Sequence, residues 1–176
     1  MTGRVANAYG KLLAGLALGG CFVMFAMMLV IVADVALRNI AVPGLPRGLA
    51  WSNEVSELML YLTTMLVAPW LLRQGQHIRV DIVLTVLPPR VAWALEWVGD
   101  TLALACCLFI TWYGTRAALA SWREGSLNIK TLVTPEWWSL APLPITFALL
   151  SVEMVFRMLR LHAGPRAPRQ DAVSAA

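Results

Sequence analysis

The sequence predicts an all-α membrane protein with four transmembrane helices and a short interfacial amphipathic helix between the second and the third. The chain has 176 residues, of which 59% are hydrophobic, and its mean hydropathy is +0.69. Charged side chains occupy only 14% of the positions, whereas a soluble domain usually carries them at about 25%. Four apolar segments separated by short charged stretches produce this composition. We therefore expect one membrane domain over residues 1–162, with spans at about 12–37, 50–73, 91–116 and 136–158.

The first span rests on an uncharged run from Leu12 to Ala33. At a rise of about 1.5 Å per residue this run can cross a hydrocarbon core of about 30 Å. It exceeds the core of a signal peptide, which is usually about 7–15 residues long, so we expect it to remain in the protein. Asp34 and Arg38 follow with i,i+4 spacing and are expected to pair at the end of the helix.

The second span needs charged residues to reach a sufficient length. Its uncharged core, Leu58 to Leu72, is too short to cross the bilayer, so the helix is expected to begin near residue 50 and to draw Glu54 and Glu57 toward the membrane. Two interpretations remain open. The glutamates can simply favour the positive end of the helix dipole, or Glu57 can make an interhelical or intersubunit contact with an arginine such as Arg38 or Arg47.

The third span, Thr101 to Thr115, is also too short unless it begins near Val91. It then includes Glu96 and Asp100, which share one helix face. Like charges at this spacing repel, so either one carboxyl is protonated or a basic group lies nearby.

The fourth span begins near Glu136 and contains Pro142 and Pro144, which are expected to distort its early turns. Near its far end Glu153 and Arg157 have the spacing of an ion pair. The remaining residues, 163–176, are rich in Gly, Pro, Arg, Ala and Ser, and are expected to form a disordered cytoplasmic tail.

The segment between the second and third spans, residues 76–87, alternates polar and apolar residues. As a helix it places His77 and Asp81 on one stripe and its valines and leucines on another, which predicts an interfacial helix in which Arg79 reaches lipid headgroups or a partner chain. A wetted connecting elbow remains the alternative. One histidine and one aspartate are too few ligands to indicate a metal site, and we expect no metal or cofactor in this chain.

The distribution of basic residues predicts the orientation. With both termini in the cytoplasm, nine Lys and Arg residues lie inside and five outside, in agreement with the positive-inside rule. The same basic residues are spread between apolar stretches instead of forming one stripe, so the net charge of +4 does not indicate a nucleic-acid partner.

Several motifs resemble the small membrane subunit of tripartite ATP-independent periplasmic (TRAP) transporters. They are the acidic cluster at the start of the second span (Asn53, Glu54 and Glu57), the run GQHIRVD at residues 75–81, and the runs Thr134-Pro135-Glu136-Trp137 and Pro142-Leu143-Pro144-Ile145 before and within the fourth span. The GxHIRVD element is the most specific of them, and the resemblance covers roughly residues 12–160. The Trp137-Trp138 doublet departs from the pattern.

The resemblance implies a location in the bacterial inner membrane and two protein partners besides membrane lipid. One is a large membrane subunit, which moves an organic acid by a sodium-coupled elevator motion. The other is a periplasmic substrate-binding protein. The small subunit would scaffold the former and help dock the latter, with no substrate or sodium of its own. The residues expected to be structural or to contact other subunits are Glu54, Glu57, His77, Arg79, Asp81 and Pro144.

Two other functions compete with this reading. The chain could be a self-contained transporter or proton carrier that uses Glu57, or Glu96 and Asp100, within the membrane. A membrane-bound enzyme is less consistent with the sequence, which offers no set of nucleophile and base, no dithiol and no cluster of metal ligands, so we expect no enzyme activity. The sequence does not identify the organic acid.

Overall fold

The computed structural model describes residues 2–40, 48–75 and 88–163. Four helices within these ranges are long and apolar enough to cross a membrane, as expected. The elements in chain order are α1 (Thr2–Asn39), α2 (Ser52–Arg73), α4 (Pro89–Glu124), β1 (Leu127–Ile129), β2 (Val133–Pro135), α5 (Trp137–Leu140) and α6 (Pro142–Ala163). The expected interfacial helix over residues 76–87 and the tail over 163–176 lie outside the described residues, apart from the last residue of α6.

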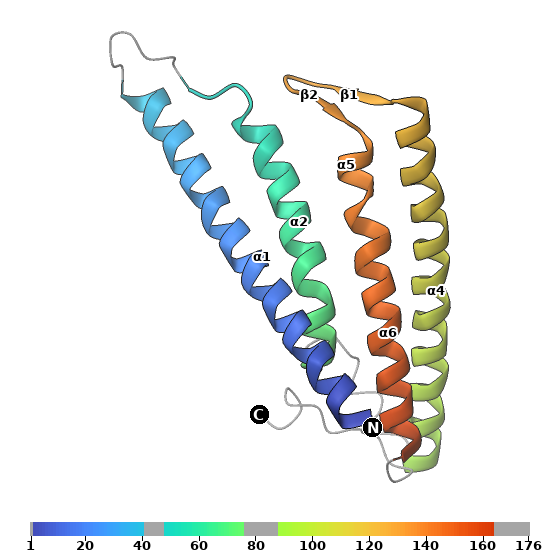
Figure 1. The fold of residues 1–176 in the computed structure, drawn as a ribbon. Helices are drawn as coiled ribbons and strands as arrows, with labels where there is room; N and C mark the ends of the chain where they lie inside the picture. The colour runs from blue at the N-terminus through green and yellow to red at the C-terminus, as the bar shows by residue number, and fades with distance from the viewer. Residues whose placement is uncertain (1, 41–47, 76–87, 164–176) are drawn as a thin grey trace.

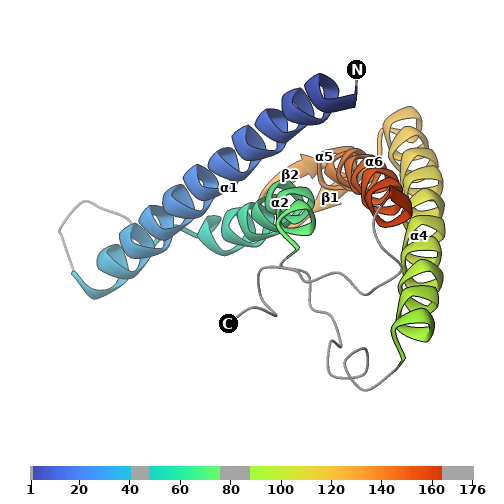
Figure 2. The same cartoon turned by 90° about the horizontal axis from the view of Figure 1, so that it is seen from below.

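The helices stand side by side instead of enclosing a central core. α2 lies between α1 and α6, and α6 lies between α2 and α4, so α1 and α4 form the two edges (Figures 1 and 2). The beginning of α1 and the end of α6 are at one end of the bundle, called the terminal end below. The β1–β2 hairpin is at the other, the hairpin end, where α1 and α4 are widely separated (Figure 1).

The side of α1 that faces α2 includes small residues. Leu13, Ala17 and Gly20 are buried at helical spacing, while Leu18 and Phe22, on other sides of the helix, are each 72% exposed. A Cβ atom on Gly20 would lie only 2.6 Å from Cγ2 of Val67 in α2. Small residues that let two backbones approach are the usual means of packing helices in lipid, where burial of apolar groups gives little net driving force.

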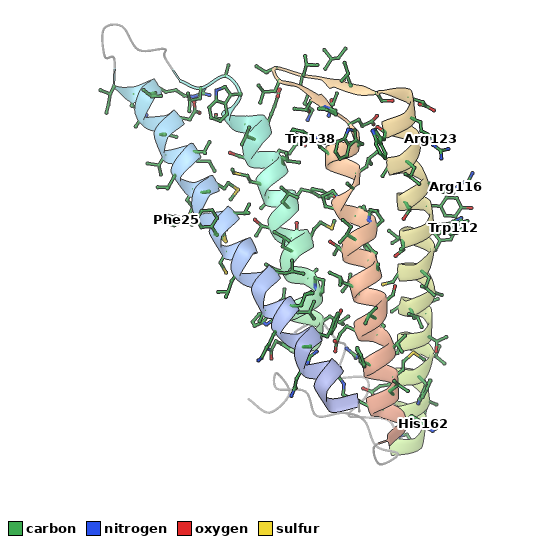
Figure 3. All side chains as sticks on the ribbon, in the orientation of Figure 1. Phe25, Trp112, Arg116, Arg123, Trp138 and His162 are labelled. Atoms are coloured by element: carbon green, nitrogen blue, oxygen red, sulfur yellow. The ribbon has the colours of Figure 1, made fainter. Side chains whose placement is uncertain are left out.

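A small apolar core joins α2, α4 and α6 toward the terminal end. It contains Leu72, Cys107, Leu150 and Met154, with Phe147 packed against them. Many large apolar side chains on the four helices are exposed, and Trp112 on α4 points away from the bundle (Figure 3). An outer surface of this kind suits contact with lipid or with another membrane protein.

Three helices extend beyond the expected spans, since α6 continues past residue 158 to Ala163, and the fourth span is interrupted. α1 begins before residue 12, and α4 continues past residue 116 to a left-handed Gly125 that ends it. The one-turn helix α5 is separated from α6 at Ala141, immediately before Pro142. Because a proline lacks the N–H of a helical hydrogen bond, the distortion expected from Pro142 and Pro144 takes the form of a break.

Candidate subunit interface

The acidic residues at the start of α2 hold the tip of the β1–β2 hairpin. The two carboxylate oxygens of Glu54 accept hydrogen bonds from the backbone N–H groups of Thr131 at 2.7 Å and Leu132 at 2.9 Å. One turn further along, Glu57 forms an ion pair with Lys130, with 3.1 Å between Oε2 and Nζ. The hairpin is thereby fixed over the start of α2, although the two are far apart in the sequence.

These contacts identify which residue pairs with Glu57 within this chain. Its partner among the described residues is Lys130 of the hairpin, whereas Arg38, one of the two arginines considered, pairs with Asp34 at 2.8 Å. The other arginine considered, Arg47, lies outside the described residues. The Glu57 side chain is 69% exposed, so it belongs to the end of the bundle and not to its interior.

Asp34 ties the end of α1 to the segment that leads into α2. One of its oxygens takes Arg38 in the expected i,i+4 pair, and the other accepts the N–H of Leu49 at 2.6 Å. Gly48, beside them, has a φ of +97°, a conformation that glycine adopts without strain. The hairpin end therefore carries two carboxylates, Asp34 and Glu54, that each accept hydrogen bonds from loop backbone.

Pro144 lies at a close contact between α6 and α4. A Cβ on Gly114 would lie 2.6 Å from Cδ2 of Leu143 and 3.5 Å from Cδ of Pro144, so any larger residue there would require Leu143 to shift. Just below, the hydroxyl of Thr146 donates to the carbonyl oxygen of Met65 and joins α6 to α2. Pro144 is thus part of the packing among the three helices, and its contact with another subunit stays a prediction.

A buried ionic cluster at the terminal end joins all four helices. Glu153 on α6 is fully buried and takes Arg73 of α2 at 3.6 Å and Arg160 on its other oxygen. Arg73 also donates to the carbonyl oxygen of Ala6 in α1, at 2.9 Å. A fully buried carboxylate is tolerated when it is paired and hydrogen-bonded in this way.

The same cluster reaches α4 through Arg157. Its Nε lies 3.2 Å from Oδ1 of Asp100, and both side chains are buried. Arg157 is therefore the basic group that the spacing of Glu96 and Asp100 required. It was expected to pair with Glu153 one turn away, but Glu153 instead pairs with Arg73 of α2 and with Arg160 of its own helix. Glu96 is also buried and makes polar contacts of its own.

The remaining predicted interface residues, His77, Arg79 and Asp81, lie outside the described residues. The structure brings together Glu54 and Glu57 at the hairpin end, and it places Pro144 on the neighbouring helix α6. No group of three or more potential metal ligands is found within the described ranges.

Sequence reasoning missed the hairpin, Lys130, and the role of Arg73. The β-branched residues within 129–134, which follow the helix-ending Gly125, are typical of strands and could have indicated the hairpin. Ile129 pairs with Val133 across a three-residue turn. Arg73 had no comparable signal, because the groups that it contacts lie on other helices.

Aromatic side chains mark both ends of the bundle. Trp137 contacts Trp122 and Trp138 at the hairpin end, while Trp97 lies against Trp93 and the ring of His162 at the terminal end. Figure 3 shows Trp138 and His162 at these opposite ends. Tryptophan is enriched where a membrane protein passes through the headgroup region, so the aromatic residues delimit an apolar band between the two polar clusters.

These features define a multi-pass membrane protein whose polar groups hold its own helices together and whose apolar surface is open to its surroundings. Residues 27–164, more than half of the chain, match the family described as "Tripartite ATP-independent periplasmic transporters, DctQ component". The chain belongs to this family and is a DctQ-type small subunit. It is also 26% identical over 111 residues to a curated protein of Haemophilus influenzae, "Putative TRAP transporter small permease protein". That match covers 62% of this chain and 62% of the relative, so it spans less than two thirds of the relative's length.

Proposed function

We propose that this chain is the non-catalytic scaffold of a TRAP-type secondary transporter in the bacterial inner membrane. It packs against a large subunit that carries an organic acid by a sodium-coupled elevator motion, and it helps dock the periplasmic binding protein. The observation that carries the proposal is the single row of four helices, because this arrangement exposes a wide apolar surface to a membrane partner.

The buried carboxylates favour this function over that of a self-contained proton carrier. Glu153 and Asp100 are each in contact with arginine side chains. The pair of Glu153 with Arg73 joins α6 to α2, and the pair of Asp100 with Arg157 joins α4 to α6, so both carboxylates have a structural role in the bundle. We therefore assign the ionic cluster to the assembly of the four helices.

The hairpin end supports a role in docking. Its tip is fixed by Glu54 and Glu57, and Ile129 at the end of β1 is 79% exposed. With both termini in the cytoplasm, this end faces the periplasm and presents a rigid edge to a soluble partner. The segment with His77, Arg79 and Asp81 would then lie on the cytoplasmic side, near the large subunit and the lipid headgroups.

Affinity purification of the tagged chain from its native membrane in mild detergent tests the proposal. We expect a far larger polytopic protein to copurify in a stoichiometric amount. Recovery of the chain alone, together with solute movement by the chain in liposomes, would instead support the self-contained transporter.

Two charge reversals, Arg79→Glu and Glu57→Lys, are expected to lower the yield of the large subunit while the chain stays in the membrane. Lys130→Gln is the matched control for Glu57, since it removes the hairpin ion pair and leaves the glutamate in place. If Lys130→Gln reduces the yield as much as Glu57→Lys, Glu57 acts through the hairpin and not through the partner. If both reversals copurify the partner at the wild-type yield, these roles are wrong.

A further inference from the structure

A cavity of about 450 Å³ lies at the hairpin end, between α2 on one side and α5 and the start of α6 on the other. The hydrogen bond from Thr146 to the carbonyl oxygen of Met65 joins the two sides toward the middle of the bundle. The hairpin covers the opposite end, where Glu54 and Glu57 hold it. The volume falls in the range of about 300–1,000 Å³ that is typical of sites for small molecules.

The cavity has charged side chains at its rim and apolar side chains along the helices. Glu57 of α2 and Lys130 of the hairpin turn lie at the rim, whereas Tyr61 and Leu143 line the part nearer the middle of the bundle, with Leu58 between them. Trp138, on α5, lines the cavity at the level where the aromatic residues gather. This order matches a phospholipid, which places its headgroup at the interface and its acyl chains in the hydrocarbon.

The charges at the rim select among headgroups. Glu54, Glu57 and Lys130 are the charged side chains among the described residues that line the cavity, and their net charge is negative. Both oxygens of Glu54 already accept backbone hydrogen bonds, so an entering headgroup meets Glu57 and Lys130. These two are 3.1 Å apart, partly exposed and of opposite sign.

We propose that the cavity binds one phospholipid of the surrounding bilayer, with a zwitterionic ethanolamine headgroup. Its phosphate pairs with the Lys130 ammonium and its own ammonium with the Glu57 carboxylate, while an acyl chain lies along Leu58 and Tyr61. An anionic headgroup lacks an ammonium group that could pair with Glu57, and the net negative charge of the rim disfavours it. This inference needs only the membrane insertion of the chain, and it stands or falls apart from the proposed scaffold function.

Native mass spectrometry of the purified full-length chain tests the proposal. The chain is incubated with equal amounts of phosphatidylethanolamine and phosphatidylglycerol in detergent. The mass of the lipid that stays bound after activation then identifies it. We expect one tightly held phosphatidylethanolamine and a preference of about tenfold over phosphatidylglycerol, since the headgroups differ by one charge-assisted contact.

Two variants locate the site. Leu58→Trp fills the apolar part of the cavity and is expected to abolish the tight adduct, whereas Leu18→Trp, on the 72% exposed surface of α1, is expected to preserve it. Glu57→Lys makes the rim net positive and is expected to reverse the preference toward phosphatidylglycerol. This reversal is a gain of binding, which a misfolded variant would not show.

The proposal is overturned by any of four results. Three of them are equal retention of the two lipids by the unsubstituted chain, an adduct that survives Leu58→Trp, and a preference that Glu57→Lys leaves unchanged. A cavity that retains no lipid in the isolated chain but closes around a side chain of the large subunit would also overturn it.

Discussion

Glu153 shows how an acidic residue is kept within a membrane span. Its side chain is fully buried, but Arg73 and Arg160 approach it from two sides, and Arg73 in turn reaches the backbone of Ala6. The carboxylate thus connects α6 to α2 and, through Arg73, to α1. Glu57 is the opposite case, since its ion pair with Lys130 is open to the surroundings.

Glu153→Gln should therefore destabilise the fold much more than Glu57→Gln. Removing one member of a buried ion pair costs about 3–5 kcal/mol, because a charge is left buried without a partner. Arg160 is 53% exposed and can turn toward the headgroups, so we expect a loss of about 3 kcal/mol. The Glu57 variant should lose at most about 1 kcal/mol.

The free energy of unfolding in mixed detergent micelles, followed by far-ultraviolet circular dichroism, measures both changes. Equal losses in the two variants would show that the depth of Glu153 contributes nothing to its effect.

Among the elements, the long helices were predictable and the hairpin was not. A long uncharged run such as Leu12 to Ala33 directly indicates a helix that can cross a membrane. All four spans were expected and are found. The hairpin has strands of only three residues, and Glu54 stabilises it from another helix. Contacts of this kind depend on tertiary placement. For the same reason the sequence indicated Glu54 and Glu57 as candidates but did not reveal Lys130 as a partner.

The packing of α1 on α2 leads to a prediction with a built-in control. In Gly20→Val the new Cβ would lie 2.6 Å from Cγ2 of Val67, a short and stiff side chain that cannot move aside. We expect α1 to be displaced from α2 and the chain to lose about 1–3 kcal/mol of stability, as is usual for overpacked sites.

Gly19→Val places the same side chain one position earlier, where no atom lies within 4 Å. Its stability should change by no more than about 0.5 kcal/mol. Both variants alter helix propensity alike, so the difference between their unfolding free energies isolates the contact. A difference near zero would mean that α1 and α2 do not require this close approach.

At the scale of the whole molecule, the polar groups form two layers separated by apolar surface. One layer contains the hairpin contacts, and the other contains the ionic cluster that joins the helices near the beginning of α1 and the end of α6 (Figure 1). The two layers fit the two headgroup regions of a bilayer. Their contents differ, since the hairpin contacts link loops to helices and the ionic cluster links helices to each other.

This arrangement, with the excess of basic residues near the termini, predicts which end faces the cytoplasm. In a background in which Cys21, Cys106 and Cys107 are replaced, Ile129→Cys places one exposed thiol on the hairpin and His162→Cys places one at the end of α6. In intact cells with a permeable outer membrane, a membrane-impermeant maleimide should label the first variant and not the second. The second should react only after the inner membrane is opened, which also shows that its thiol is accessible. Labelling of His162→Cys in intact cells, with protection of Ile129→Cys, would invert the topology and place the hairpin in the cytoplasm, where it could not dock a periplasmic protein.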